Sequence, residues 1–284
     1  MKITRNMRIG IIGGKGRTGR QFATFFQNHG FQVVVTDKKT RNRTKKLFET
    51  CDIVLFSVPL QESVKIMREE IGNAIRKDQL ILDVSSLKTE QVATMQRGKG
   101  EVIGMHPMFG PKTQAAGQTV ILCPGRCGRE TLQSLRRLLR SMGMRTTIVS
   151  PTAHDRLMVF VQALPHLKSL LVAAALEALG ADLDRIDTVS PLTYEMELNL
   201  VGRFLDDDPL LYGPIIFGNR DSQKIIDTLR KLLGDFSTIC KTQDYSRFSK
   251  HYRTLQRRFG ASRLARARGR SEVAIRAITS IPHS

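Results

Sequence analysis

The sequence predicts an α/β fold, with an N-terminal doubly wound parallel sheet followed by an all-α C-terminal domain. Three observations carry this prediction. A glycine-rich turn follows the first strand-like run, short Val- and Ile-rich runs alternate with helix-length stretches over residues 1–150, and residues 151–260 are helical in pattern. The chain has 284 residues, which is enough for two medium-sized domains.

Six apolar runs in the first part have the length and composition of buried strands. They lie at residues 8–12, 31–36, 53–58, 80–84, 101–105 and 119–123. We expect a domain boundary near residue 150, where long apolar stretches such as 157–179 replace the alternation. Pro165 should interrupt the first long helix, because it has no backbone N–H to donate. Residues 261–284 are rich in Arg, which predicts a mobile basic tail or a loosely attached helix.

The formal net charge of +19 is concentrated at the two ends of the chain. Residues 1–46 contain 12 basic residues and one acid, and residues 247–284 contain 10 basic residues and one acid. With no Trp and only four Tyr, the basic segments lack the interleaved aromatic side chains on which bases stack. We therefore expect small anionic ligands and no nucleic acid as partner.

No apolar stretch of 18 or more residues is free of polar residues, and the first residues do not resemble a secretory signal. We therefore expect a cytoplasmic enzyme without a membrane partner. The four cysteines form no CxxC pair and have no histidine at zinc-finger spacing, so we expect reduced thiols and no metal.

Gly14, Gly16 and Gly19 form a GxGxxG motif between the first strand and a helix. Such glycines allow a tight turn, close approach of a pyrophosphate and close helix packing, so the motif predicts a Rossmann domain that binds a dinucleotide. Asp37 ends the second strand, where its carboxylate would accept hydrogen bonds from the ribose hydroxyls of NAD. Lys38, Lys39 and Arg41 follow it and could accommodate the phosphate of NADP. The expected cofactor-binding residues are Gly14, Gly16, Arg17, Thr18, Gly19, Asp37, Ser57 and Pro59.

Several motifs, taken together, closely resemble the prephenate dehydrogenases of tyrosine biosynthesis. They are IIGGKGRTGRQF, SVP at 57–59, DVSSLK at 83–88, GMHPMFGP at 104–111, HDRLMVFVQALPH at 154–166 and SPLTYEMELNLVGRFLDDDPLLY at 190–212. The resemblance extends over residues 7–260 and is greatest to the dehydrogenase half of bacterial proteins fused to chorismate mutase. Since no mutase helix bundle fits before Met7, we expect no mutase activity.

This resemblance implies oxidative decarboxylation of prephenate to 4-hydroxyphenylpyruvate with a nicotinamide cofactor. His106 corresponds to the catalytic histidine, which accepts the proton of the ring hydroxyl, and Ser86 corresponds to the serine that holds this hydroxyl. Arg203 corresponds to the arginine that binds a substrate carboxylate. Taken alone, His106 could be a turn residue, Ser85 or Ser86 a helix cap, and Arg203 a surface charge.

His166 and Gln162 lie in a segment that resembles one lining the substrate cleft, although His166 could equally be a satisfied core histidine. Tyr194 is followed by Glu195 where the relatives have an Arg. Asp207 stands where they have an amide, and an acid there could pair with the ammonium group of arogenate. Asp207 could instead be one of a run of solvated acids. For the protein as a whole, the alternatives are an arogenate dehydrogenase and a nicotinamide-binding regulator without turnover. The resemblance also implies a homodimer.

Overall fold

The computed structural model describes residues 1–71, 75–111 and 113–279, with the side chains of residues 41–43, 71 and 279 left out. Contacts divide the chain into two compact units. Unit 1 comprises Met1–Gln162 and Gly213–Asn219, and unit 2 comprises Ala163–Tyr212 and Arg220–Ser284. The expected boundary near residue 150 follows the change from strands to helices, whereas compactness divides the chain after Gln162.

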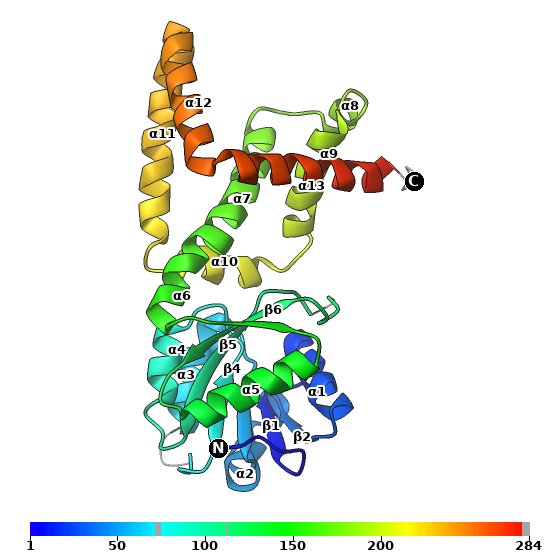
Figure 1. Ribbon diagram of the computed structural model, residues 1–284, viewed down its shortest axis with the longest axis vertical. Helices are drawn as coiled ribbons and strands as arrows, with labels where there is room; N and C mark the ends of the chain where they lie inside the picture. Colours follow the sequence, from blue (N-terminus) through cyan, green and yellow to red (C-terminus); the bar gives the residue numbers. More distant parts are fainter. Residues whose placement is uncertain (72–74, 112, 280–284) are drawn as a thin grey trace. The chain divides into compact units, whose positions relative to one another are not determined.

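Unit 1 contains a seven-stranded sheet of order β2-β1-β3-β4-β5-β6-β7 (Figure 1). Its strands are β1 Arg8–Ile12, β2 Gln32–Thr36, β3 Ile53–Phe56, β4 Leu80–Asp83, β5 Glu101–Pro107, β6 Thr119–Pro124 and β7 Arg145–Ile148. All neighbouring strands are parallel except β5 and β6. This arrangement confirms the predicted doubly wound sheet and brings the carboxyl ends of β1 to β5 to one edge.

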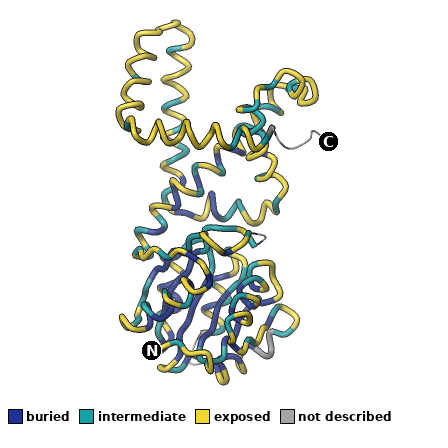
Figure 2. Tube along the Cα trace, turned by 45° about the vertical axis from the view of Figure 1, so that its right-hand side comes forward, coloured by how far each residue is buried: buried dark blue, intermediate teal, exposed yellow. Residues whose placement is uncertain are grey.

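Helices cover both faces of the sheet, because alternate side chains of each buried strand point to opposite faces. On one face, Phe22 and Phe26 of α1 (Arg17–Asn28) and Leu135 of α5 (Arg129–Ser141) belong to one apolar cluster. On the other face, a second cluster includes side chains of α2 (Thr44–Thr50), α3 (Leu60–Ile71) and α4 (Thr89–Met95). Figure 2 shows the strands as the most buried part of the unit.

The sequence did not predict two features of this sheet. Strand β7 was missed because its residues RTTI are mostly exposed and form no apolar run. Strand β6 runs antiparallel to β5 because residues 108–118 are too few for the helical crossover that a parallel neighbour needs.

The helices that follow the sheet begin with α6 (Pro151–Met158), a π-helical turn (Val159–Ala163) and α7 (Leu164–Ala178). Pro165 lies in the first turn of α7, where a missing N–H is tolerated, so the expected interruption is a π-helical turn. By length and composition alone, Pro151–Ala178 is the one described segment that could cross a membrane, with 28% of its most apolar window buried. Core helices of soluble proteins also meet this criterion.

Most residues of the remaining helices are exposed (Figure 2). Many of these exposed residues are large and apolar. These helices are α8 Leu183–Asp187, α9 Leu192–Leu205, α10 Pro209–Phe217, α11 Ser222–Thr242, α12 Tyr245–Phe259 and α13 Ala261–Thr279. Gln243, with φ of 50°, ends α11 in the left-handed region and begins the tight connection to α12. The basic C-terminal residues that the structure describes form the helix α13, which contacts α9 and α12 within unit 2.

Candidate active site

His106 lies near the carboxyl end of β5, opposite Ile121 of β6, and is only 3% exposed. Gly104, two residues earlier in the same strand, leaves room for a buried lysine. A Cβ atom there would lie 2.8 Å from Cδ of Lys88 and 3.1 Å from Oδ1 of Asp83. The sequence GMHP therefore places a histidine ring beside a buried ion pair at the edge of the sheet where ligands bind in such folds.

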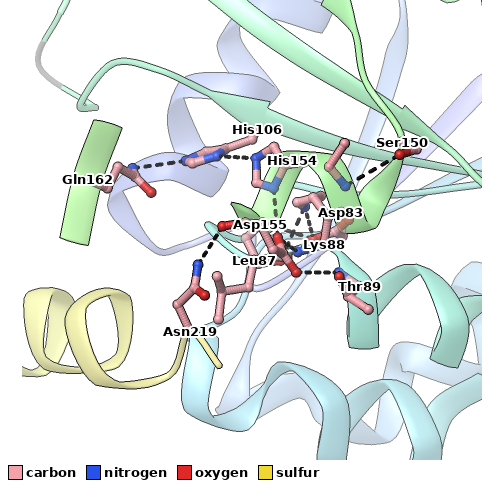
Figure 3. A network of polar contacts seen from close by, with 12 residues as sticks. Asp83, Leu87, Lys88, Thr89, His106, Ser150, His154, Asp155, Gln162 and Asn219 are labelled. Atoms are coloured by element: carbon pink, nitrogen blue, oxygen red, sulfur yellow. Dashed lines mark hydrogen bonds and ion pairs between the residues drawn. The ribbon is translucent and has the colours of Figure 1, made fainter. Parts of the chain in front are cut away.

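Polar side chains from β5, α6 and the π-helical turn form a continuous line through His106 (Figure 3). Its Nδ1 lies 2.8 Å from Nε2 of His154, and Nδ1 of His154 lies 2.7 Å from Oδ1 of Asp155. On the other side, Nε2 of His106 lies 3.2 Å from Nε2 of Gln162. Burial, aided by His154 and by the nearby Lys88 ammonium, lowers the pKa of His106 well below its ordinary value of 6.5. His106 is therefore a neutral imidazole at physiological pH.

Asp155 fixes this line to the rest of unit 1. Its Oδ1 accepts a hydrogen bond from the backbone N–H of Lys88 and its Oδ2 one from that of Thr89, both at 2.8 Å. These N–H groups begin α4, so the carboxylate caps a helix far from it in sequence. The Nδ2 of Asn219 donates to the backbone carbonyl of Asp155 at 2.6 Å. Burial raises the pKa of Asp155, but the hydrogen bonds from His154, Thr89 and Lys88 outweigh it and leave the pKa below 3.8.

Lys88 and Asp83 form a salt bridge in which both side chains are fully buried. Ser85 joins this pair, since its N–H donates to Asp83 Oδ2 at 3.0 Å and its hydroxyl lies 3.2 Å from Lys88 Nζ. Ser85 is thus held inside the ion pair and does not cap α4. Ser86 is half-buried, and its hydroxyl has no hydrogen-bond partner within the described residues. Of the two serines, Ser86 is the one whose hydroxyl is available to a ligand.

The glycine turn is tight and leaves little room for side chains. Gly13 adopts φ of 82°, and a Cβ on Gly14 would lie 2.5 Å from the Val35 side chain. A Cβ on Gly19 would lie 2.4 Å from the carbonyl oxygen of Gly13. Gly16 precedes α1 without a side-chain cap, and the first turn of α1 contains no acid, so the positive end of the helix dipole lies at this turn. Arg17 and Thr18 begin this helix, while Ser57 follows β3 and Pro59 precedes α3.

Asp37 directly follows β2, at the same edge of the sheet. Its Oδ1 accepts hydrogen bonds from the N–H of Thr40 at 3.0 Å and from its hydroxyl at 2.9 Å, and Lys15 Nζ lies 3.3 Å from Oδ2. These contacts, that of Thr40 first, lower the pKa of Asp37 and keep it a carboxylate. Lys38 and Lys39 are exposed, and the side chain of Arg41 lies outside the described residues.

The other expected substrate residues belong to unit 2. His166 stacks on Phe204, with ring centroids 5.7 Å apart, and packs against Tyr212 at 4.7 Å. The Tyr212 hydroxyl donates to Oδ2 of Asp207 at 3.5 Å. Burial lowers the pKa of His166. Unit 2 therefore brings an imidazole and a carboxylate to one aromatic cluster. Arg203 lies in the last turn of α9 and is exposed, and no hydrogen bond, ion pair or ring contact joins its guanidinium to this cluster within the described residues.

The cysteines take no part in these sites. All four are free, and Cys51 and Cys123 are buried. Burial raises the pKa of Cys123 to about 12, which leaves its thiol protonated. Among the residues that the structure describes, no cluster of His, Cys, Asp and Glu could hold a metal ion.

Two family models together match most of the chain. The model described as prephenate dehydrogenase, nucleotide-binding domain, matches residues 17–148, and the one described as prephenate dehydrogenase, dimerization domain, matches residues 150–254. The chain belongs to the prephenate dehydrogenase family. The resemblance read from the motifs is thereby confirmed.

Curated relatives agree with this assignment. A protein of Methanocaldococcus jannaschii named probable arogenate/prephenate dehydrogenase is 30% identical over 97% of this chain and 66% of its own length. The T-protein of Enterobacter agglomerans is 29% identical over 88% of this chain and 67% of its own length. The chain thus spans about two thirds of the length of these relatives.

Solved structures share the fold at lower identity. Prephenate dehydrogenase of A. aeolicus, in complex with hydroxyphenyl propionate and NAD+, has a TM-score of 0.71 and 18% identity, covering 89% of this chain and 97% of its own. Arogenate dehydrogenase of Synechocystis has a TM-score of 0.68 and 19% identity, covering 87% and 97%.

Reasoning from sequence missed four polar residues around His106, namely Asp83, Lys88, His154 and Asp155. The Asp and Lys flank the SS dipeptide of DVSSLK, and the His and Asp open HDRLMVFVQALPH. An adjacent His-Asp pair at the start of an apolar helix, where polar groups are rarely buried without partners, is the signal that could have indicated them.

Proposed function

We propose that the chain is an NAD-dependent dehydrogenase that oxidises prephenate to 4-hydroxyphenylpyruvate with loss of carbon dioxide. The observation that carries this proposal is the state of His106, a buried and neutral imidazole at the carboxyl edge of the sheet. A neutral ring nitrogen can accept the proton that the substrate hydroxyl loses as hydride leaves the carbon that bears it. Family membership supports the same reaction class.

Ser86, which follows the neighbouring strand β4, supports this role. In the register of the sheet Asp83 of β4 pairs with Gly104 of β5, so Ser86 and His106 both follow this pair toward the same edge. The Ser86 hydroxyl is free to hold the substrate hydroxyl while His106 accepts its proton. Loss of the ring carboxylate as carbon dioxide then makes the ring aromatic, and the resulting phenolate oxygen takes the proton back from His106.

The glycine turn fits a dinucleotide, because a Cβ on Gly13, Gly14 or Gly19 would lie 2.1, 2.5 or 2.4 Å from neighbouring atoms, so the turn is as tight as a pyrophosphate site requires. When bound, a nicotinamide supplies the hydride acceptor. Gly14, Gly16 and Gly19 would admit the pyrophosphate, and the Asp37 carboxylate would accept ribose hydroxyls. We propose NAD over NADP, because Asp37 would repel a 2′-phosphate, whereas Lys38 and Lys39 are exposed and act through solvent.

Arg203 is proposed to bind a substrate carboxylate with its guanidinium, and His166 and Gln162 to line the substrate site. Asp207 favours a second candidate, arogenate dehydrogenase, because an ammonium group could pair with its half-buried carboxylate. The hydrogen bond from Tyr212 to Asp207 favours prephenate, because the Asp207 carboxylate then has a partner within the protein and needs no ammonium group of the substrate.

We also propose a homodimer formed through the helical domain. Unit 2 leaves large apolar side chains exposed, among them Leu179 at 84%, Leu200 at 55% and Leu233 at 64%. Patches of this kind are commonly covered by a partner, and the matching dimerization-domain family supports this interpretation. We propose a cytoplasmic location, which is the expectation for a dehydrogenase of tyrosine biosynthesis.

A binding experiment separates the enzyme from a regulator that kept the fold and lost the reaction. NAD affinity is measured by calorimetry, and turnover is measured in the same preparation with prephenate and with arogenate. The enzyme proposal requires binding together with turnover. Tight NAD binding without turnover of either compound would support the regulator, and light scattering of the same sample tests the dimer.

A further inference from the structure

The two buried histidines beside Asp155 determine one another's protons. Asp155 is a carboxylate and can only accept, so the nitrogen of His154 that faces it, Nδ1, must carry a hydrogen. In a neutral His154 the other nitrogen, Nε2, is then a lone-pair acceptor. Nδ1 of His106, 2.8 Å away, must donate to it.

The same reasoning fixes the opposite side of the His106 ring. With its hydrogen on Nδ1, neutral His106 presents a lone pair at Nε2. The atom that faces this lone pair is Nε2 of Gln162, an amide nitrogen that donates, at 3.2 Å. Oε1 of Gln162 is buried and has no hydrogen-bond partner in the described part of the chain, so no second bond holds the amide against His106. A substrate hydroxyl can take its place at Nε2.

Asp155 is held in place by several contacts. Asp155 is held through both carboxylate oxygens by the first N–H groups of α4, and its backbone carbonyl is held by Asn219. The other charged groups near the rings are Lys88 and Asp83, which neutralise each other in a buried salt bridge. The amide nitrogen of Gln162 agrees with a lone pair at His106 Nε2, because a protonated His154 would donate to His106 Nδ1 and leave a hydrogen on Nε2 facing that nitrogen.

We propose that His154 and Asp155 are positioning residues that hold His106 in the Nδ1–H tautomer, with the Nε2 lone pair directed toward the substrate hydroxyl. In the reaction the O–H bond of the substrate hydroxyl breaks and the proton moves to His106 Nε2. The imidazole of His106 thereby becomes an imidazolium. The Nδ1–H of that cation remains bonded to His154, and the Asp155 carboxylate stabilises the charge through the His154 ring. The role in turnover rests on the proposed dehydrogenase function, whereas the tautomer is a property of the protein alone.

Two substitutions at His154 separate positioning from packing. His154→Phe keeps an aromatic ring in the fully buried position but removes both nitrogens. His154→Gln places an amide oxygen near the position of the lost Nε2, where it can accept from Nδ1–H of His106. His29→Gln is the matched control, because within the described residues the His29 ring forms hydrogen bonds to backbone carbonyls alone, those of Phe25 and Ser141.

The first measurement is the tautomer of His106, read from the imidazole 15N shifts of the histidine-labelled full chain without ligands. The inference requires a protonated Nδ1 and a bare Nε2 in the wild type, in His29→Gln and in His154→Gln. It requires a shift toward the Nε2–H form in His154→Phe. A wild type in the Nε2–H form, or a His154→Phe variant with an unchanged tautomer, would overturn it.

The second measurement is kcat and KM for prephenate at saturating NAD. His154→Phe should lower kcat by between about 10-fold and 10⁴-fold, the range seen when an orienting partner is lost or a histidine is held in the wrong tautomer, with little change in KM. His154→Gln should recover most of this loss. Equal losses in both folded variants would indicate packing alone and overturn the inference. If His154→Phe does not fold, the 15N spectra of the wild type and of His154→Gln test the inference, because both must show the Nδ1–H tautomer of His106. A wild type that turns over neither prephenate nor arogenate contradicts the proposed function, and the tautomer measurement still tests the inference.

Discussion

The buried salt bridge between Lys88 and Asp83 should make a large contribution to the free energy of unfolding of unit 1. Replacing Lys88 by Met removes the cation and leaves the Asp83 carboxylate fully buried. Removing one partner of such a pair typically destabilises a protein by about 3–5 kcal/mol, because the remaining charge has lost its compensation. Oδ1 of Asp83 has no hydrogen-bond partner in the described part of the chain, so only Oδ2, with its contacts to Ser85, is compensated. The cost should therefore lie within this range.

Urea unfolding followed by far-ultraviolet circular dichroism measures this cost. Lys65→Met is the matched control, since Lys65 is exposed on α3 and its replacement should change the free energy of unfolding by no more than about 0.5 kcal/mol. In the double variant Lys88→Met/Asp83→Asn the buried group is neutral and can still accept from Ser85, so a favourable coupling of about 0.5–3 kcal/mol is expected. A loss below about 1 kcal/mol in Lys88→Met would refute the reasoning that the pair is dry and tightly coupled.

Three further predictions concern the site. His106→Asn should lower kcat by a factor of about 10² to 10⁴ with little change in KM. Arg203→Gln should chiefly raise KM, by the equivalent of about 2–3 kcal/mol. If steady-state kinetics showed the reverse pattern, the roles given to His106 and Arg203 would be wrong. Asp37→Ser should shift kcat/KM from NAD toward NADP, and an unchanged cofactor preference would refute the role of the carboxylate. Because burial lowers the pKa of His106, its neutral form persists as the pH falls below 6.5 and is lost only on further acidification through the lowered pKa. The acid limb of the kcat/KM profile should thus have its midpoint below 6.5, and a midpoint at or above 6.5 would contradict the proposed protonation state.

Local patterns predicted most of the sheet because its central strands are buried on both faces. The runs around Ile11, Leu55 and Leu82 form uninterrupted apolar segments, and each lies in the strand expected for it. Strand β7 could not be predicted in this way. An edge strand needs only one covered side, so its residues Thr146 and Thr147 carry no apolar signature.

Some parts of the site depend on local sequence and others on the tertiary fold. The glycine turn and the strand that leads to His106 are local features, and their spacing was sufficient to predict them. The partners of His106 come from residues 154 and 162, brought close only by the tertiary fold. The helix cap likewise defied local reasoning, since α4 is capped by Asp155 of α6 and not by a neighbouring serine.

The most direct test of the account is a steady-state assay that crosses prephenate and arogenate with NAD and NADP, using wild type and His106→Asn in parallel. We predict reduction of NAD with prephenate, one carbon dioxide released for each NADH formed, lower kcat/KM for the other three combinations, and loss of turnover in His106→Asn while NAD binding is retained. Higher kcat/KM with arogenate would assign the second candidate substrate. Wild-type protein that binds NAD but reduces neither cofactor with either substrate would contradict the central claim.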